Sequence, residues 1–143
     1  MNITLREYKR EDFIVLQNII RETWHYDDLS SPKTAQRLAG VFLSSCLTNY
    51  TYSRVALDNG KPVGIILLNN KAKHKCPLGL KFQQIREIIS LYLSKEGRKV
   101  SKIFESVSDI DKKLLNECDI EYPAELALFA VKPSYRGKGI GKQ

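Results

Sequence analysis

The sequence lacks any long apolar run. Nowhere does it approach the roughly 20 consecutive apolar residues that a membrane-spanning helix needs. Its first residues, MNITLREYKRED, place no apolar stretch behind a basic head, so they do not resemble a secretory signal. We therefore expect a cytoplasmic protein that does not bind membranes. With 43% hydrophobic and 27% charged residues, residues 1–143 are expected to form one globular domain that buries a core without disulfide or metal crosslinks.

Cysteine and histidine are scarce as well. The three cysteines (Cys46, Cys76 and Cys118) are odd in number and widely spaced, and the two histidines lie far apart. The sequence contains neither a CxxC pair nor a His/Cys cluster with ligand spacing, which argues against a disulfide framework and against a metal site. We expect reduced thiols and no bound metal.

Acidic residues are missing from the end of the chain. The net charge is +7, and from Leu126 onward four cations occur without an acid: Lys132, Arg136, Lys138 and Lys142. Nucleic-acid binding would need aromatic side chains placed for stacking beside such cations, and only Tyr135 lies among them. A small anionic ligand suits this terminus at least as well, and we expect no nucleic-acid partner.

What the sequence does contain is a regular alternation of strand and helix patterns. Alternating or continuous apolar residues predict strands, and apolar residues three or four apart predict helices. We expect a first strand at residues 2–6, helices at 10–24 and 31–46, and two strands at 50–57 and 61–70. Two more helices within residues 77–118, a fourth strand at 124–131 and a turn at 132–143 complete the expected order. We place the break between the last two helices near Gly97.

Three local signals refine this order. Asp58-Asn59-Gly60 predicts a tight hairpin, because asparagine and glycine tolerate positive φ. Gly64 inside a strand pattern indicates a bulge or a close backbone approach. The segment AELALFAV, residues 124–131, is apolar on both faces, which is typical of a central strand.

The chain ends with VKPSYRGKGIGKQ, in which glycines alternate with basic and apolar residues. Glycine lets the backbone approach an anion closely, and a helix beginning there would offer it free amides. The segment therefore predicts a phosphate cradle. A P-loop is excluded because Gly141-Lys142 is followed by Gln143, and a dinucleotide fingerprint because the spacing is GxGxG.

These features together resemble the GNAT superfamily of N-acetyltransferases. Arg136, Gly139 and Gly141 occupy the positions of that family's pyrophosphate-binding signature, Gln or Arg followed by xxGxGly/Ala. The segments ITLREYKREDF and VALDNGKPVGIILL are similar to the family's opening strand and helix and to its second and third strands. The resemblance implies a mixed, mostly antiparallel sheet flanked by helices.

The resemblance also implies an activity, direct transfer of acetyl from acetyl-coenzyme A to a primary amine of a small molecule or peptide. The pantetheine arm of acetyl-coenzyme A would pair with the fourth strand, and its pyrophosphate would lie on the amides of the glycine-rich segment. The implied cofactor-binding residues are Phe129, Ala130, Val131, Arg136, Gly137, Lys138, Gly139, Ile140, Gly141 and Lys142.

Glu125 is the candidate general base, acting directly or through a water, because it begins the fourth strand and is expected on one face with Ala127, Phe129 and Val131. The alternative is a polar residue at a solvated strand end. Trp24, His25 and Tyr26 lie where relatives line the acceptor site. For them the alternative is a core tryptophan and an exposed histidine.

Two departures from the family are apparent. Residues 71–123 form a longer helical segment than usual, which we expect to shape the acceptor cleft or a subunit contact. The chain stops just after the pyrophosphate motif, so we expect a C-terminally truncated domain that lacks its last strands and its general acid. Alone it would be inactive and would bind acetyl-coenzyme A weakly or not at all, and its exposed sheet edge could form a homodimer. The alternative function is a catalytically inactive acyltransferase-like module that binds a partner.

Overall fold

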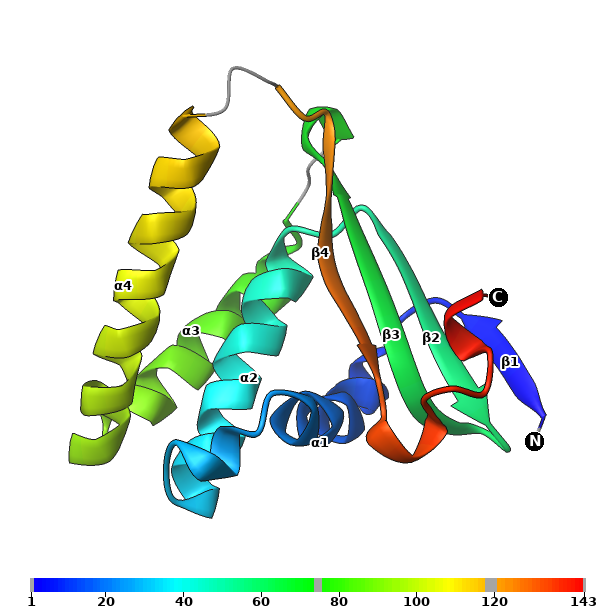
Figure 1. Cartoon of the computed structure of the whole chain (residues 1–143), viewed down its shortest axis with the longest axis horizontal. Helices are drawn as coiled ribbons and strands as arrows, with labels where there is room; N and C mark the ends of the chain where they lie inside the picture. Colours follow the sequence, from blue (N-terminus) through cyan, green and yellow to red (C-terminus); the bar gives the residue numbers. More distant parts are fainter. Residues whose placement is uncertain (1, 74–75, 118–120, 143) are drawn as a thin grey trace.

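A computed structural model describes residues 2–73, 76–117 and 121–142. Within these ranges the chain forms four α-helices and one four-stranded antiparallel sheet, which confirms the mixed α/β class (Figure 1). Two positions of the sequence analysis lie outside the described residues. They are Cys118, at the end of the predicted helical region 77–118, and Gln143, at the end of the glycine-rich segment. In the described part, no helix combines the length and the apolar character that crossing a bilayer would require.

The strands stand in the sheet in chain order. β1 (Ile3–Arg6) pairs with β2 (Tyr52–Asp58), β2 with β3 (Lys61–Asn70) and β3 with β4 (Ala124–Val131), and every pair is antiparallel. The predicted hairpin joins β2 and β3. Asn59 and Gly60 both have positive φ, 49° and 80°, as the mirror-image turn of a tight hairpin requires.

Gly64 lies beside a bulge, as its position within a strand pattern predicted. The register between β2 and β3 shifts so that Val63 has no partner on β2. A Cβ atom on Gly64 would lie 3.0 Å from the carbonyl oxygen of Ala130 on β4. The absence of a side chain therefore lets β4 come close to β3 at the end of the sheet where the glycine-rich segment begins.

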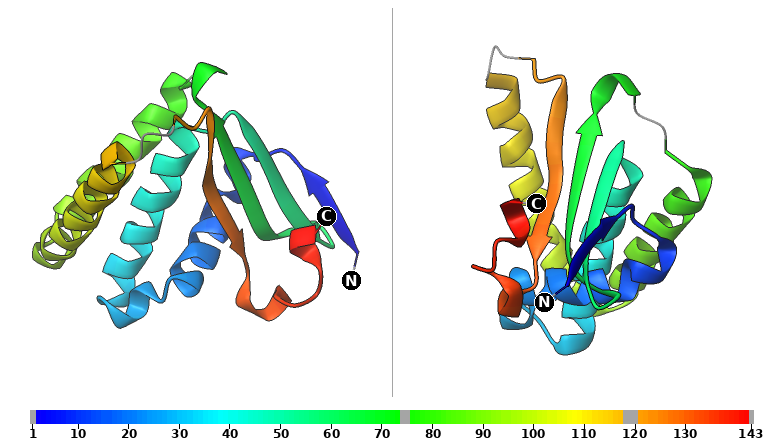
Figure 2. Two further views of the ribbon diagram at one scale, coloured as in Figure 1. Left: turned by 45° about the horizontal axis from the view of Figure 1, so that its top comes forward. Right: turned by 90° about the vertical axis from the view of Figure 1, so that its right-hand side faces the viewer.

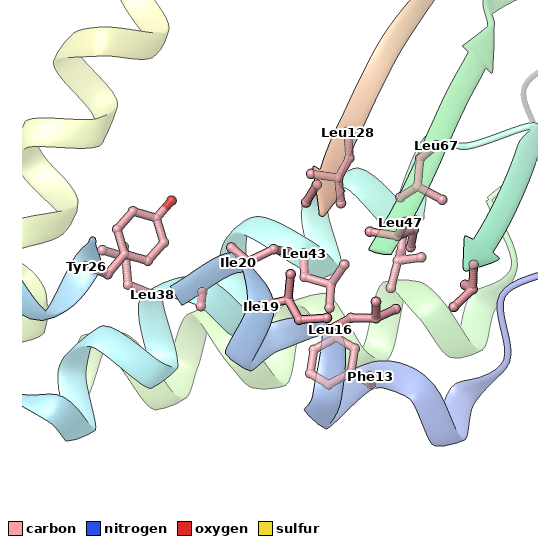
Figure 3. Close-up of a cluster of buried hydrophobic side chains, with 14 of the residues drawn as sticks. Phe13, Leu16, Ile19, Ile20, Tyr26, Leu38, Leu43, Leu47, Leu67 and Leu128 are labelled. Carbon is pink, nitrogen blue, oxygen red and sulfur yellow. The ribbon is translucent and has the colours of Figure 1, made fainter. Parts of the chain in front are cut away.

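Helices α1 (Phe13–Thr23) and α2 (Pro32–Thr48) lie on one face of the sheet (Figure 2). α2 begins with Ser31 at the N-cap and Pro32 in the first turn, where its missing N–H is not needed. The core is formed by the apolar stripes of both helices against β3 and β4 (Figure 3), among them Phe13, Leu16, Ile20, Leu43, Leu47, Leu67 and Leu128.

The long segment between β3 and β4 forms α3 (Leu78–Tyr92) and α4 (Lys95–Glu117). The chain breaks at Leu93 and Ser94, and Gly97 instead lies in the first turn of α4. A Cβ atom on Gly97 would collide with the carbonyl oxygen of Leu91. Gly97 is thus needed for the close approach of the two helices and not for the break itself.

The two predicted apolar stripes of this segment are mostly exposed. On α3, Leu78, Phe82, Ile85 and Ile89 are exposed, whereas Leu80 and Leu91 are buried. On α4 only the first turns contact the rest of the chain, and every residue from Glu105 to Glu117 is exposed. Accordingly, α4 stands apart from α2 and β4 along most of its length (Figure 1).

The position predicted for β4 is wrong for the described residues. β4 lies at the edge of the sheet, paired only with β3. Leu128 and Ala130 are buried against the helices, but Leu126 is 58% and Phe129 49% exposed. The apolar residues on its outer face had suggested a strand covered on both sides, and in this structure no helix covers that face.

Candidate functional site

The glycine-rich segment folds back over the open face of the sheet. After β4 a 3-10 turn covers Pro133–Tyr135, and a second covers Ile140–Lys142. Between them Gly137 and Gly139 have positive φ of 74° and 77°, so residues with a Cβ would be strained there. The helix expected to begin here is limited to this one 3-10 turn within the described residues.

Side-chain hydrogen bonds hold the glycine turn, residues 132–142, at both of its sides. The hydroxyl of Tyr135 donates to the Asp58 carboxylate at 2.9 Å, and this interaction, together with partial burial, raises the pKa of Tyr135. The guanidinium of Arg136 donates to the carbonyl of Val131 at 3.1 Å and to the hydroxyl of Thr23 at 3.2 Å. The turn is therefore tied to the β2–β3 hairpin and to the end of α1.

The far end of the glycine turn is packed against the sheet. Ile140 is 7% exposed and contacts Ala56 and Val63 in a small second core. A Cβ atom on Gly141 would lie 3.1 Å from the ring of Phe129. The backbone at Gly141 therefore packs closely on the Phe129 side chain, which would have to shift to admit a larger residue.

These contacts form a hollow of about 430 Å³ at the end of β4. It is lined by Thr23, Phe129, Ala130, Val131, Tyr135, Arg136, Gly137, Gly139, Ile140 and Gly141. Eight of the ten implied cofactor-binding residues are thus brought together, and the other two, Lys138 and Lys142, belong to the same turn. The ammonium of Lys138 lies 4.9 Å from the centre of the Tyr135 ring, an arrangement that keeps this cation close to the hollow.

The amides of the turn have the character of an anion site. No backbone carbonyl of the described residues accepts a hydrogen bond from the amides of Gly139, Ile140 or Gly141. The sign of φ alternates from Gly137 to Gly139, the kind of backbone that turns successive N–H groups toward a common point. Free amides and nearby cations together can bind a diphosphate.

β4 contains a second bulge, which sequence reasoning missed. Leu128 pairs with Leu67 and Leu126 pairs with Leu68, so Ala127 has no partner on β3. The carbonyl of Ala127 accepts a hydrogen bond from the Cys46 thiol at 3.4 Å. A bulge disrupts the ladder locally, and β4 has no second strand neighbour in the described sheet.

The bulge changes the orientation of Glu125, and the prediction that Glu125 shares a face with Phe129 is wrong. Glu125 pairs with Asn69, and its carboxylate accepts a hydrogen bond from the Asn69 amide at 3.1 Å. Asn69 belongs to the alternating set of β3 residues, including Leu67, that are buried on the helix side. Glu125 therefore points toward α2, whereas Phe129 faces the open side of the sheet.

Glu125 lines a second hollow of about 320 Å³ on the α2 side of β4, with Phe42, Ser45, Cys46, Asn49, Leu126 and Ala127. Burial, and to a lesser extent the charge of Glu125, raises the pKa of the Cys46 thiol to about 12. The Oδ1 atom of Asn69 is buried without a hydrogen-bond partner, the kind of group that ordered waters satisfy. The hollow is thus lined by a carboxylate and a neutral thiol, and the open Asn69 acceptor is buried next to Glu125.

The three predicted acceptor residues are separated by the fold. Trp24 is exposed and packs on Phe42, with ring centres 5.3 Å apart. His25 is exposed and adopts the left-handed conformation at φ 52°. Tyr26 is 3% exposed and packs edge-on against Phe104 in the core, so it offers almost no surface to a ligand.

Several residues of this region carried no recognisable sequence signal. Thr23, Phe42, Cys46 and Asn69 come from α1, α2 and β3 and approach β4 only in the folded chain. Trp24 lines neither hollow itself, but it follows Thr23 of the first hollow in the chain and packs on Phe42 of the second. The candidate site is therefore the edge of β4 with a hollow at each end.

Comparisons with models of protein families, with curated proteins and with solved structures gave no match for this chain.

Proposed function

We propose that this chain carries the acetyl-coenzyme A site of an N-acetyltransferase of the GNAT type, which transfers acetyl directly from the thioester to a primary amine. One observation carries the proposal. The hollow at the end of β4 is lined by the strand exit, by Arg136 and by the glycine turn, and these are the residues that the sequence resemblance implies for the cofactor.

The residues of the turn fit a diphosphate. Positive φ at Gly137 and Gly139, the free amides of the following residues and the close approach of Gly141 to Phe129 form a cradle that a Cβ would distort or fill. The surrounding cations favour an anion further. Because Tyr135 and Arg136 already fix the turn, the amides are oriented before a ligand arrives.

The edge of β4 fits the rest of the carrier. Acetyl-coenzyme A supplies a thioester at the end of a pantetheine arm whose amides can pair with a strand edge as a peptide does. Four residues, about 13 Å of strand, separate Val131 at the hollow from Ala127 at the bulge. A free backbone N–H near the bulge is suited to stabilise the oxyanion that develops when an amine attacks.

The hollow beside Glu125 is the proposed acceptor site. A primary amine of the lysine type has a pKa of roughly 10.4 in water, so it must lose a proton before it attacks. Glu125, or a water held between its carboxylate and the Oδ1 atom of Asn69, would accept this proton. Trp24 and Phe42 provide an apolar wall for the part of the acceptor next to the amine.

One observation favours the alternative, an inactive acyltransferase-like module. Glu125 points toward α2 and is engaged by Asn69, on the opposite side of β4 from Phe129. The two functions differ in turnover, so an acetyl-transfer assay separates them.

Coenzyme A binding is tested first, by NMR titration of the ¹⁵N-labelled chain with coenzyme A up to millimolar concentration. We expect shifts concentrated at the amides of residues 129–131 and 136–142. Gly139→Val should abolish them, whereas Leu115→Ala, at an exposed position of α4, should leave them in place. Shifts spread evenly over the basic surface, or shifts that Gly139→Val leaves unchanged, would refute the cradle.

Transfer itself is tested with the protein expressed from its complete reading frame. A panel of primary amines is assayed by release of the free thiol of coenzyme A. Glu125→Gln should lower kcat by about 100-fold, the usual contribution of a general base, whereas Glu121→Gln, at a nearby exposed carboxylate, should not change it. Full activity of Glu125→Gln would remove the residue from the mechanism, and no turnover with any amine would favour the inactive module.

A further inference from the structure

The second half of α4 is an amphipathic helix without a partner in the described chain. From Glu105 to Glu117 every residue is exposed, although the segment is about as short as helices that are only marginally stable alone in water. Three apolar side chains of this part, Val107, Ile110 and Leu114, are 49%, 55% and 57% exposed, and Ile103 just before it is 58% exposed. Such a helix needs a surface that covers this stripe.

The stripe has the spacing of a helix-pairing seam. Ile103, Val107, Ile110 and Leu114 follow one another at intervals of four, three and four residues, and Val100, three residues before Ile103, is buried in the core of the chain itself. This is the a/d pattern of a coiled coil, in which two helices pack their apolar seams against each other along their length. An apolar stripe confined to the a and d positions is the narrow seam of paired helices, so it suits another helix that carries the same seam.

The charges of α4 identify the orientation of that partner. Lys95, Arg98, Lys99 and Lys102 with Glu96 give the first turns a net charge of +3, whereas the part from Glu105 to Glu117 has a net charge of −2. Two copies of α4 lying antiparallel would bring the basic end of each beside the acidic end of the other. A parallel pair would place like charges together, which is unfavourable.

We propose that two copies of this chain associate through an antiparallel pair of α4 helices. Val107 of each copy lies opposite Ile110 of the other, and Ile103 lies opposite Leu114. The same surface is used by both copies around a twofold axis, so the assembly closes as a dimer. This contact uses α4 and not the edge of β4, and it does not depend on the proposed function.

Sedimentation equilibrium of the chain over a range of concentrations tests the association. We expect a dimer that Ile110→Glu weakens by at least about tenfold, since this places two carboxylates within the seam. Leu115→Glu is the matched control, because Leu115 is 61% exposed on the same helix but lies outside the seam, and it should leave the dissociation constant unchanged. Helicity measured by circular dichroism should rise with concentration in the parent chain and not in Ile110→Glu.

Crosslinking tests the orientation. Chains in which the native cysteines are replaced by serine receive either Ile103→Cys or Leu114→Cys, and the two are mixed and oxidised. An antiparallel pair gives the mixed disulfide, whereas a parallel pair gives each variant linked to itself. A monomer at all concentrations, a dimer that Ile110→Glu does not weaken, or linkage of each variant only to itself would overturn the proposal. A dimer that Ile110→Glu does not weaken would indicate an interface at the edge of β4 instead.

Discussion

Replacing Asp12 by asparagine tests how the start of α1 is attached to the sheet. Asp12 is 2% exposed, and its carboxylate accepts hydrogen bonds from two nitrogens of the Arg6 guanidinium, at 2.7 Å each, and from the Lys9 amide at 2.9 Å. Burial alone would raise the pKa of Asp12, but the hydrogen bonds and charges of Arg6 and Lys9 outweigh it and lower the pKa. The carboxylate is therefore stabilising in its ionised form.

The expected loss in the free energy of unfolding depends on whether Arg6 or Asp12 is left without its partner. Breaking a buried ion pair by removing one member costs about 3–5 kcal/mol. Asparagine keeps one oxygen acceptor, and the Arg6 side chain, 26% exposed, regains contact with water, so we expect Asp12→Asn to cost about 2 kcal/mol. Arg6→Met leaves the more deeply buried Asp12 without its counter-charge and should cost about 3 kcal/mol.

Urea unfolding at pH 7 and at pH 3 measures both effects. A loss of about 2 kcal/mol lowers the unfolding midpoint by about 1 M. Because the pKa of Asp12 is lower in the folded chain than its unfolded value of about 3.9, its stabilisation is complete above that value and is lost as the pH falls through the folded pKa. The deficit of Asp12→Asn should therefore shrink at pH 3.

An exposed pair of similar geometry serves as the control. Asp27 accepts hydrogen bonds from Arg21 at 2.8 and 2.5 Å, but its side chain is 45% exposed, so Asp27→Asn should change the midpoint much less than Asp12→Asn. Equal midpoints for Asp12→Asn and the parent chain at pH 7, or a deficit that is the same at both pH values, would refute the reasoning.

Three further outcomes follow from burial and hydrogen bonding. Burial raises the pKa of the Cys46 thiol to about 12, so alkylation of the native chain at pH 8 should leave Cys46 unmodified until urea is added. Mass spectrometry measures the modification, and rapid labelling of Cys46 in the native chain would contradict this prediction. The hydroxyls of Ser31 and Thr34 and the Ser31 amide lower the pKa of Glu96 to about 2, so NMR should detect its titration near that pH, and Thr34→Val should move it upward. Leu16→Ala should cost about 3 kcal/mol in urea unfolding, because Leu16 is fully buried, whereas Ile14→Ala, 60% exposed on the same helix, should cost less than about 0.5 kcal/mol.

The parts of the fold that depend on local chemistry were predictable. Asn59 and Gly60 specify their turn because few residues tolerate positive φ, and Gly64 marks the bulge at Val63 because glycine is unusual inside a strand. The grouping of Arg136 and the glycines of the turn beside Val131 follows equally from a strand that ends just before them. These signals act within a few residues of chain and need no tertiary information.

The features that were missed depend on contacts between distant segments. The apolar run of β4 does not reveal whether anything covers its outer face, and Leu126 and Phe129 turn out to be exposed. The bulge at Ala127 has no local signal, since neither glycine nor proline marks it, and it reverses the expected direction of Glu125. Helical spacing likewise predicted the stripe through Ile110 but not which surface would meet it.

The attachments of Tyr135 to Asp58 and of Arg136 to Thr23 have a consequence for how the glycine turn responds to its environment. The conformational entropy of the turn is lost when the chain folds, so an incoming anion need not immobilise it again. Its affinity should then depend on residues that never touch the anion. Removing either hydrogen bond, that of Tyr135 to Asp58 or that of Arg136 to Thr23, would weaken anion binding. The effect would come mainly from faster dissociation of the anion, because the free amides themselves are unchanged.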